Sequence, residues 1–172
     1  MPEQTMPVIE TEGSSRAAMI REFGRPPVHI GESEKESPWV PWVPGIHIRH
    51  LAFDVRSNSF TNILWVAQGG MLGRHRHRGP VFGYVLEGSW RYLEHDWIAR
   101  PGDYIGEPPG AVHTLVSDDP NGMKTLFWLN GSLEFLSDDG QVAETFDVFW
   151  FIDHYVTYCR ERNLKINEQL WI

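Results

Sequence analysis

Between Pro38 and about Leu136 the chain is a series of short runs rich in β-branched and aromatic residues, separated by Gly, Pro, Asn and Asp. Many short strands with turn residues at this spacing are typical of a β-sandwich or a β-barrel. Asn130-Gly131 between two apolar runs predicts a two-residue hairpin. The expected strands are His47–Val55, Asn62–Ala67, Val81–Leu86, Ser89–Leu93, Trp97–Ala99, Thr114–Val116 and Lys124–Leu129.

The pattern changes at both ends of the chain. Residues 1–36 are expected to form an extended arm, with a short helical patch at Ser15–Phe23 followed by a Gly/Pro-rich loop. Near the other end, apolar residues recur at helical spacing over Asp147–Arg162, with Asp147 as a candidate N-cap. We therefore predict three parts: an arm (1–36), a β-barrel (37–146), and a C-terminal helix and tail (147–172) packed on the barrel.

Composition narrows the class of protein. The 172 residues suggest one domain, and 41% of them are hydrophobic, which is enough for a substantial core. The net charge of −8 argues against a nucleic-acid partner. One cysteine excludes an internal disulfide, and no run approaches the ~20 apolar residues of a membrane helix. The N-terminus has no apolar signal segment, so we expect a cytoplasmic protein without membrane contact.

Three histidines form a candidate metal site. His75 and His77 are two residues apart, so on a strand both side chains project from the same face. His113 follows after a hairpin and a Pro/Gly loop, a separation that can return the chain beside the first pair in an antiparallel barrel. Three converging imidazoles suit a divalent ion of the first transition row.

The residues around these histidines follow two spaced patterns. The first places five residues between Gly69 and His75, one before His77, three before Val81 and six before Gly88. The second places five residues between Gly102 and Pro108, one before Gly110, two before His113 and three before Ser117. This frame resembles the two motifs of the cupin superfamily. The resemblance implies a mainly β fold, a jelly-roll barrel also described as a double-stranded β-helix, with His75, His77 and His113 as the metal ligands.

Two positions depart from the family pattern. Val81 stands where the family has its Glu ligand, and Ser117 stands where it has Asn. Without the carboxylate, an ion keeps its full +2 charge and, in octahedral geometry, three free positions for a chelating substrate and O2. A structural zinc site with four protein ligands is disfavoured. Glu94 or Glu107 could still enter the coordination shell from elsewhere.

Other residues near the motifs suggest a pocket. Alternation along the strand places Val81 on the same face as His75 and His77. Trp65, Tyr92 and Tyr104 lie in neighbouring segments, and with Val81 they are the candidate substrate-binding residues for a flat aromatic molecule. Glu107 is a candidate base, or a partner that orients a ligand imidazole.

Over most of its length the protein is similar to one group of cupins, the 2,4′-dihydroxyacetophenone dioxygenases. The likeness covers GRHRHRGPVFGYVLEGSWRYLEHDWIARPGDYIGEPPGAVHTLV, the preceding SPWVPWVPG and a helical tail. The resemblance implies one Fe(II) per subunit, with other divalent metals possible as isolated. It implies cleavage of a small aromatic α-hydroxyketone by O2, giving 4-hydroxybenzoate and formate.

Two alternatives share these motifs. A β-diketone or flavonol dioxygenase would use the same ligands. A non-catalytic alternative is a zinc-binding sensor module like those of anti-sigma factors, although residues 1–36 contain no cysteine and are short for a sigma-binding domain. Because exposed sheet edges favour pairing, we also expect a homodimer or a dimer of dimers.

Overall fold

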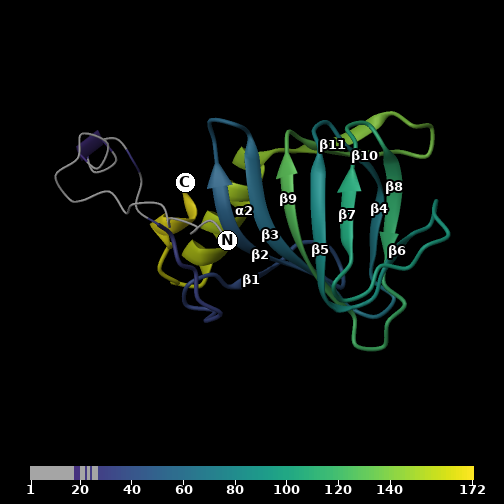
Figure 1. Ribbon diagram of the computed structural model, residues 1–172, viewed down its shortest axis with the longest axis horizontal. Coiled ribbons are helices and arrows are strands. Elements are labelled where there is room, and N and C mark those ends of the chain that lie inside the picture. Colours follow the sequence, from purple (N-terminus) through teal and green to yellow (C-terminus); the bar gives the residue numbers. More distant parts are fainter. Residues whose placement is uncertain (1–17, 20–21, 23, 25–26) are drawn as a thin grey trace, which may run out of the picture.

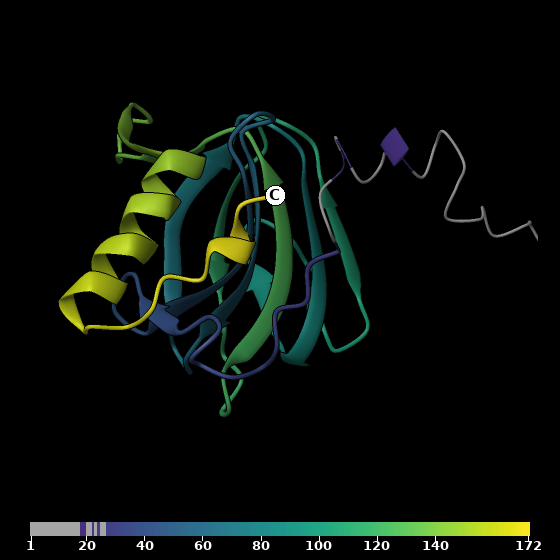
Figure 2. The same ribbon diagram turned by 90° about the vertical axis from the view of Figure 1, so that its left-hand side faces the viewer.

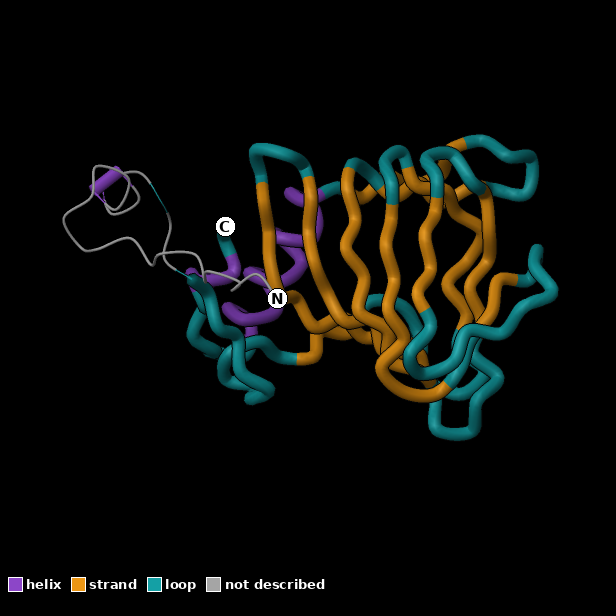
Figure 3. Tube along the Cα trace, in the orientation of Figure 1, coloured by secondary structure: helices purple, strands orange, loops and turns teal. Residues whose placement is uncertain are grey.

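A computed structural model describes residues 18–19, 22, 24 and 27–172. Its core is two antiparallel sheets that face each other (Figures 1 and 3). Sheet A has the order β1-β2-β3-β9-β5-β7, and sheet B has the order β11-β10-β4-β8-β6. The mainly β fold expected from the sequence is confirmed. The helical patch expected at Ser15–Phe23 lies largely outside the described residues.

The strands are short and alternate inward apolar with outward polar residues over much of their length, which places one face of each sheet in the core. Strand β5 shows the pattern clearly, because Val81, Gly83 and Val85 are buried while Phe82, Tyr84 and Leu86 are exposed. The strands are β1 (Trp39–Pro41), β2 (Ile46–Asp54), β3 (Ser59–Val66), β4 (Met71–His77), β5 (Val81–Gly88), β6 (Arg91–Tyr92), β7 (Tyr104–Glu107), β8 (Val112–Val116), β9 (Met123–Asn130), β10 (Leu133–Leu136) and β11 (Val142–Phe146).

Two sequence expectations about strands are wrong. Trp97–Ala99 is not a strand, since it contributes only an isolated bridge between Ala99 and Trp90. Asn130-Gly131 does not close a hairpin, because β9 lies in sheet A and β10 in sheet B. The turn instead carries the chain from one sheet to the other, and the Gly131 amide donates to the Asn58 carbonyl at 2.7 Å.

Helix α2 (Val148–Glu161) covers one side of the barrel beside β1, β2 and β11, as Figure 2 shows. As predicted, Asp147 is its N-cap, and the carboxylate accepts a 3.0 Å hydrogen bond from the Trp150 amide. Val148, Phe151, Tyr155 and Cys159 form its buried stripe. A 3₁₀ turn, η1 (Glu168–Leu170), follows near β2. No helix among the described residues is long and apolar enough to cross a membrane.

Candidate metal centre

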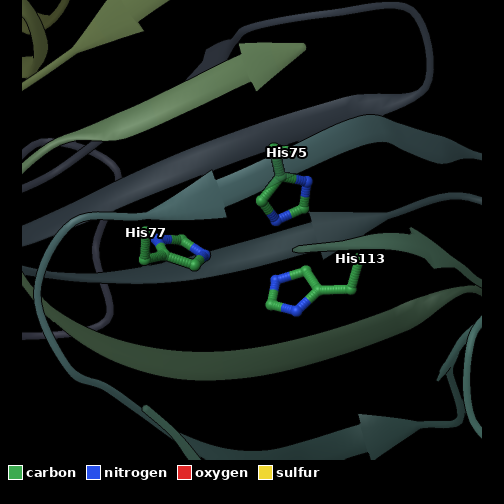
Figure 4. Close-up of side chains that lie close together, drawn as sticks. All are labelled: His75, His77 and His113. Carbon is green, nitrogen blue, oxygen red and sulfur yellow. The ribbon is translucent and has the colours of Figure 1, made fainter. Parts of the chain in front are cut away.

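The three predicted histidines lie together inside the barrel. His75 and His77 are on β4, His113 is on the neighbouring β8, and His75 and His113 are directly opposite each other in the register of the two strands. All three are buried, and their candidate ligand atoms lie within 4.8 Å of one another. Figure 4 shows the three rings converging on one region. This group can hold a metal ion.

An irregularity in β4 positions the imidazoles. The register with β8 shifts between Leu72 and His75, so Leu72, His75 and His77 all point inward despite the odd spacing of the first two. His75 Nδ1 lies 2.7 Å from the Gly73 carbonyl. A hydrogen bond from Nδ1 to this carbonyl leaves Nε2 as the nitrogen with a free lone pair.

Burial keeps these imidazoles neutral. It lowers the pKa of His75 to about 4 and that of His113 to about 3, and it holds the pKa of His77 well below its ordinary value. For His77 and His113, the neighbouring imidazoles add to the effect. Neutral imidazole is the form that binds metals, so the site is prepared for a cation at neutral pH.

Glu107, at the end of β7 in the opposite sheet, completes the polar surface of the site. Its Oε2 lies 3.3 Å from His113 Nε2 and 3.6 Å from His77 Nε2. Neither Glu107 Oε2 nor His113 Nε2 has a hydrogen-bond partner among the described residues, although both atoms are buried. Burial raises the pKa of this carboxyl to about 7, against a hydrogen bond from Tyr92 that lowers it.

Two partnerless polar atoms that face each other at 3.3 Å are a costly arrangement in a buried place. A cation held by the three imidazoles would use the His113 lone pair and place a positive charge near the Glu107 carboxylate. A donor set of three neutral imidazoles suits a divalent transition metal. These residues therefore fit the metal that the cupin motifs imply.

Tyr92, on β6, supports both groups. Its hydroxyl donates to Glu107 Oε1, and its ring stacks on the His113 ring at 3.8 Å between centroids and 12° between planes. Burial raises the pKa of this phenol well above its usual range. A neutral tyrosine thus holds the carboxylate on one side and the imidazole on the other.

Glu94, unlike Glu107, has no free carboxylate oxygen to offer to the three imidazoles. Its two carboxylate oxygens accept hydrogen bonds from the Thr114 amide and hydroxyl, at 2.8 and 3.0 Å. This pair fastens the turn after β6 to β8 next to His113. Of the two glutamates considered from the sequence, only Glu107 has a free oxygen directed at the histidines.

A small cavity of about 40 Å³ adjoins these groups. Val81 and Tyr92 line it, together with His75, His77 and Glu107. The rest of the wall is almost entirely apolar: Trp42, Ile48, Phe60, Leu64, Leu72, Leu115, Phe127, Leu129, Leu133 and Phe151, with Asn62 as one further polar residue. An apolar wall of this kind keeps bulk water from the histidines.

Trp65 and Tyr104 are not part of this wall, which corrects their assignment to the substrate pocket. Trp65 alternates with the buried Leu64 and Val66 on β3 and packs its ring on His47, 4.8 Å between centroids. Tyr104 is 65% exposed and stacks on Phe82 on the outer face of sheet A. Strand alternation places both aromatic rings on the side away from the cavity.

Sequence reasoning missed Asn62 and Phe127 as lining residues. Asn62 was expected in a strand, but no motif distinguishes its inward position from that of its neighbours. The inward face of β3 becomes evident only from the burial of Phe60, Asn62 and Leu64.

Comparison with known proteins adds the family. The model of the ChrR cupin-like domain matches residues 29–134, more than half of the protein. The chain belongs to the ChrR cupin-like domain family. No match to a curated protein was found.

Solved structures confirm the fold of this ChrR-like cupin. An RmlC-like cupin from Ralstonia eutropha is 26% identical, with a TM-score of 0.75 over 83% of this chain and 94% of the other. An acetylacetone dioxygenase from Acinetobacter johnsonii is 20% identical, with a TM-score of 0.69 over 77% and 93%. The Rhodobacter sphaeroides complex of SigE with the anti-sigma ChrR is 23% identical, with a TM-score of 0.51 over 73% and 70%.

Proposed function

We propose that this ChrR-like cupin is an iron(II)-dependent dioxygenase that breaks a carbon–carbon bond in the side chain of a small aromatic α-hydroxyketone, with 2,4′-dihydroxyacetophenone as the substrate. The observation that carries the proposal is the buried group of three neutral imidazoles beside an apolar cavity and a carboxylate with a free oxygen. The resemblance of the surrounding sequence to dioxygenases of this type supports the substrate.

The protein's own residues divide the work of such a reaction. His75, His77 and His113 would hold the metal through neutral nitrogens. Iron(II), when bound, supplies a Lewis acid for the two adjacent substrate oxygens and a reductant for O2. Val81 leaves the usual position of the family's carboxylate ligand apolar, which keeps coordination positions free for a chelating substrate.

Glu107 Oε2 is the group that accepts a substrate proton, because it is buried, unpartnered and next to the histidines. Tyr92 fixes the other carboxylate oxygen and so directs Oε2 inward. The balance of the reaction is simple: one hydroxyketone and one O2 give one 4-hydroxybenzoic acid and one formic acid, with no other reactant. The bond between the carbonyl and hydroxymethyl carbons breaks, and each product receives one atom of O2.

Cavity size favours a second candidate. The free space of about 40 Å³ is well below the ~150 Å³ of a cavity that holds benzene. A substrate with a ring must displace wall side chains such as Phe127, whereas a short β-diketone displaces fewer. The fold is shared with acetylacetone dioxygenase from Acinetobacter johnsonii, so cleavage of a short β-diketone is the alternative.

Oxygen uptake tests the proposal. Metal-free protein is reconstituted anaerobically with iron(II) and mixed with aerated buffer containing 2,4′-dihydroxyacetophenone or acetylacetone. We expect one O2 consumed and one formate released per hydroxyketone, and loss of both in His113→Ala. Turnover of acetylacetone alone would replace the proposal by the second candidate. Tight zinc binding without O2 uptake on either compound would overturn both and favour a metal-sensing domain.

A further inference from the structure

Asn62 is a buried amide that the proposed chemistry does not use. It is 5% exposed, points inward from β3 between Phe60 and Leu64, and lines the same cavity as His75 and His77. Its side chain makes no hydrogen bond to any described residue. The described wall around it contains no Lys or Arg.

No hydrogen bond joins the Asn62 amide to the described residues, so its hydrogen bonds go to whatever occupies the cavity that it lines, water or a ligand. A ligand that enters the cavity displaces that water and must replace its hydrogen bonds, or binding is weakened. A ligand with a polar group at this position is therefore favoured over one that is apolar there.

His50 adds a second polar group at the same place. It is directly opposite Asn62 in the register of β2 and β3 and is fully buried. Neither ring nitrogen has a hydrogen-bond partner among the described residues. The ring packs among Phe53, Phe151, His154 and Tyr155 rather than on the cavity wall. Asn62 and His50 are thus neighbouring buried polar residues on β3 and β2, and of the two only Asn62 lines the cavity.

This pair lies far from Glu107 along sheet A. The order β3-β9-β5-β7 puts Asn62 three strands from Glu107, a backbone separation of ~14 Å at the usual strand spacing. Phe127, opposite Asn62 on β9, contributes a ring to the wall between them. The histidines are on the facing sheet B, and packed sheets are ~10 Å apart. A molecule bound at the histidines therefore meets Asn62 with a different part from the one at the imidazoles.

We propose that Asn62 is a specificity-determining residue that binds a neutral hydroxyl at the end of the substrate remote from the metal-chelating oxygens. This inference rests on the proposed function and names the para-hydroxyl of an aryl ketone as the group recognised. An amide can accept from a phenol through Oδ1 and donate to it through Nδ2, which suits a hydroxyl. With no cationic residue on the described wall, a carboxylate at this end is disfavoured.

Asn62→Leu tests the assignment with a matched pair of substrates, 2,4′-dihydroxyacetophenone and 2-hydroxyacetophenone, which differ only in the para-hydroxyl. We expect kcat/KM for the hydroxylated compound to fall by about 10- to 100-fold, mainly through KM, and that for the other to change by less than about 3-fold. Ile63→Val, next to Asn62 on β3 but on the face turned away from the cavity, should leave the ratio of the two values unchanged.

Binding of unreactive ligands separates this inference from the proposed function. Calorimetry on zinc-loaded protein should show 4-hydroxyacetophenone binding more tightly than acetophenone, with the preference lost in Asn62→Leu. If the wild type cleaves the ketones but Asn62→Leu keeps its selectivity, Asn62 has no such role although the function stands. If turnover is absent but the binding preference depends on Asn62, the inference survives without the function. Absence of both overturns both.

Discussion

At the scale of single residues, the site depends on side chains that hold other side chains. Tyr92 touches both the His113 ring and the Glu107 carboxylate. His75 is oriented by the carbonyl of Gly73, two residues before it. These contacts are made within the protein, so the imidazoles and the carboxylate are positioned by the fold before any metal binds.

Tyr92→Phe separates the two contacts of this tyrosine. Phenylalanine keeps the stacking on His113 but removes the donor to Glu107 Oε1, which leaves a second oxygen of that carboxyl unpartnered. We expect the metal-free protein to lose about 1–2 kcal/mol of unfolding free energy in urea denaturation. Tyr84→Phe, on the exposed outer face of β5, is the control and should change little. An unchanged Tyr92→Phe midpoint would contradict the role given to the hydroxyl.

His50 predicts how stability depends on pH. Burial lowers its pKa from 6.5 to about 3. Between these values the unfolded chain binds a proton at His50 and the folded chain does not, so acidification lowers the unfolding free energy. The slope from this one group is at most about 1.4 kcal/mol per pH unit.

His50→Phe should therefore make the stability of metal-free protein less sensitive to pH between about 6.5 and 3. Unfolding free energies measured by denaturant titration at several pH values provide the check. His29→Phe, which changes an exposed histidine, should keep the wild-type slope. Equal slopes in all three proteins would show that His50 titrates normally in the fold.

At the scale of elements, the two glycines of the first motif, Gly69 and Gly88, are required for different structural reasons. Gly88 ends β5 with φ +65°, and a Cβ there would lie 1.8 Å from the Gly122 carbonyl oxygen. Gly69 precedes β4 with φ +71°, but a Cβ there would meet nothing within 4 Å. Gly88 is therefore required by both its backbone conformation and its close contact, whereas Gly69 is required by its backbone conformation alone.

Alanine substitutions measure this difference. We expect Gly69→Ala to cost about 1–2 kcal/mol, the cost of a left-handed conformation with a Cβ. Gly88→Ala should cost about 3 kcal/mol or more, because the backbone of the Gly122 turn must also move. Thermal unfolding of both variants gives the comparison, and similar losses would refute the contact argument.

The sequence could predict the elements that the spaced motifs define. The spacing of the motifs indicates which residues of β4 point inward, that His113 lies near them, and that Val81 also points inward. Which residues of β3 and β7 point inward was not predictable, because both faces of sheet A carry large apolar side chains. Trp65 and Tyr104 are as hydrophobic as core residues, yet alternation puts them outside. Asn130-Gly131 has the residues of a hairpin turn, and only the pairing of β9 and β10 with different sheets excludes one.

At the scale of the whole molecule, metal binding and stability are linked. A ligand that binds only the folded state adds about 2.7 kcal/mol when present at 100 times its Kd. For a protein of this size we expect removal of the metal by a chelator to lower Tm by about 5–10 °C. His113→Ala should show no such shift, while His95→Ala, in the exposed turn after β6, should keep it. If the wild-type Tm is the same with and without the chelator, the protein has no bound metal ion that stabilises it.

Homodimerisation stays a prediction, and the outer face of sheet A is where we expect it. Tyr104, Phe82 and Trp128 stack in a row there, and Tyr84 beside them is 48% exposed. A patch of this kind favours association. We expect Phe82→Lys to convert dimers to monomers in sedimentation velocity, with metal content unchanged. A wild-type monomer at micromolar concentration would contradict the prediction.

The imidazoles belong to sheet B, whereas the Glu107 carboxylate belongs to the edge strand of sheet A. The candidate metal centre and the carboxylate next to it therefore come from different sheets. Under the proposed function, a substrate larger than the cavity would enter only if the two sheets moved apart, and this would take Glu107 away from the imidazoles. Substrate entry and proton transfer would then be successive steps, with closure of the sheets between them.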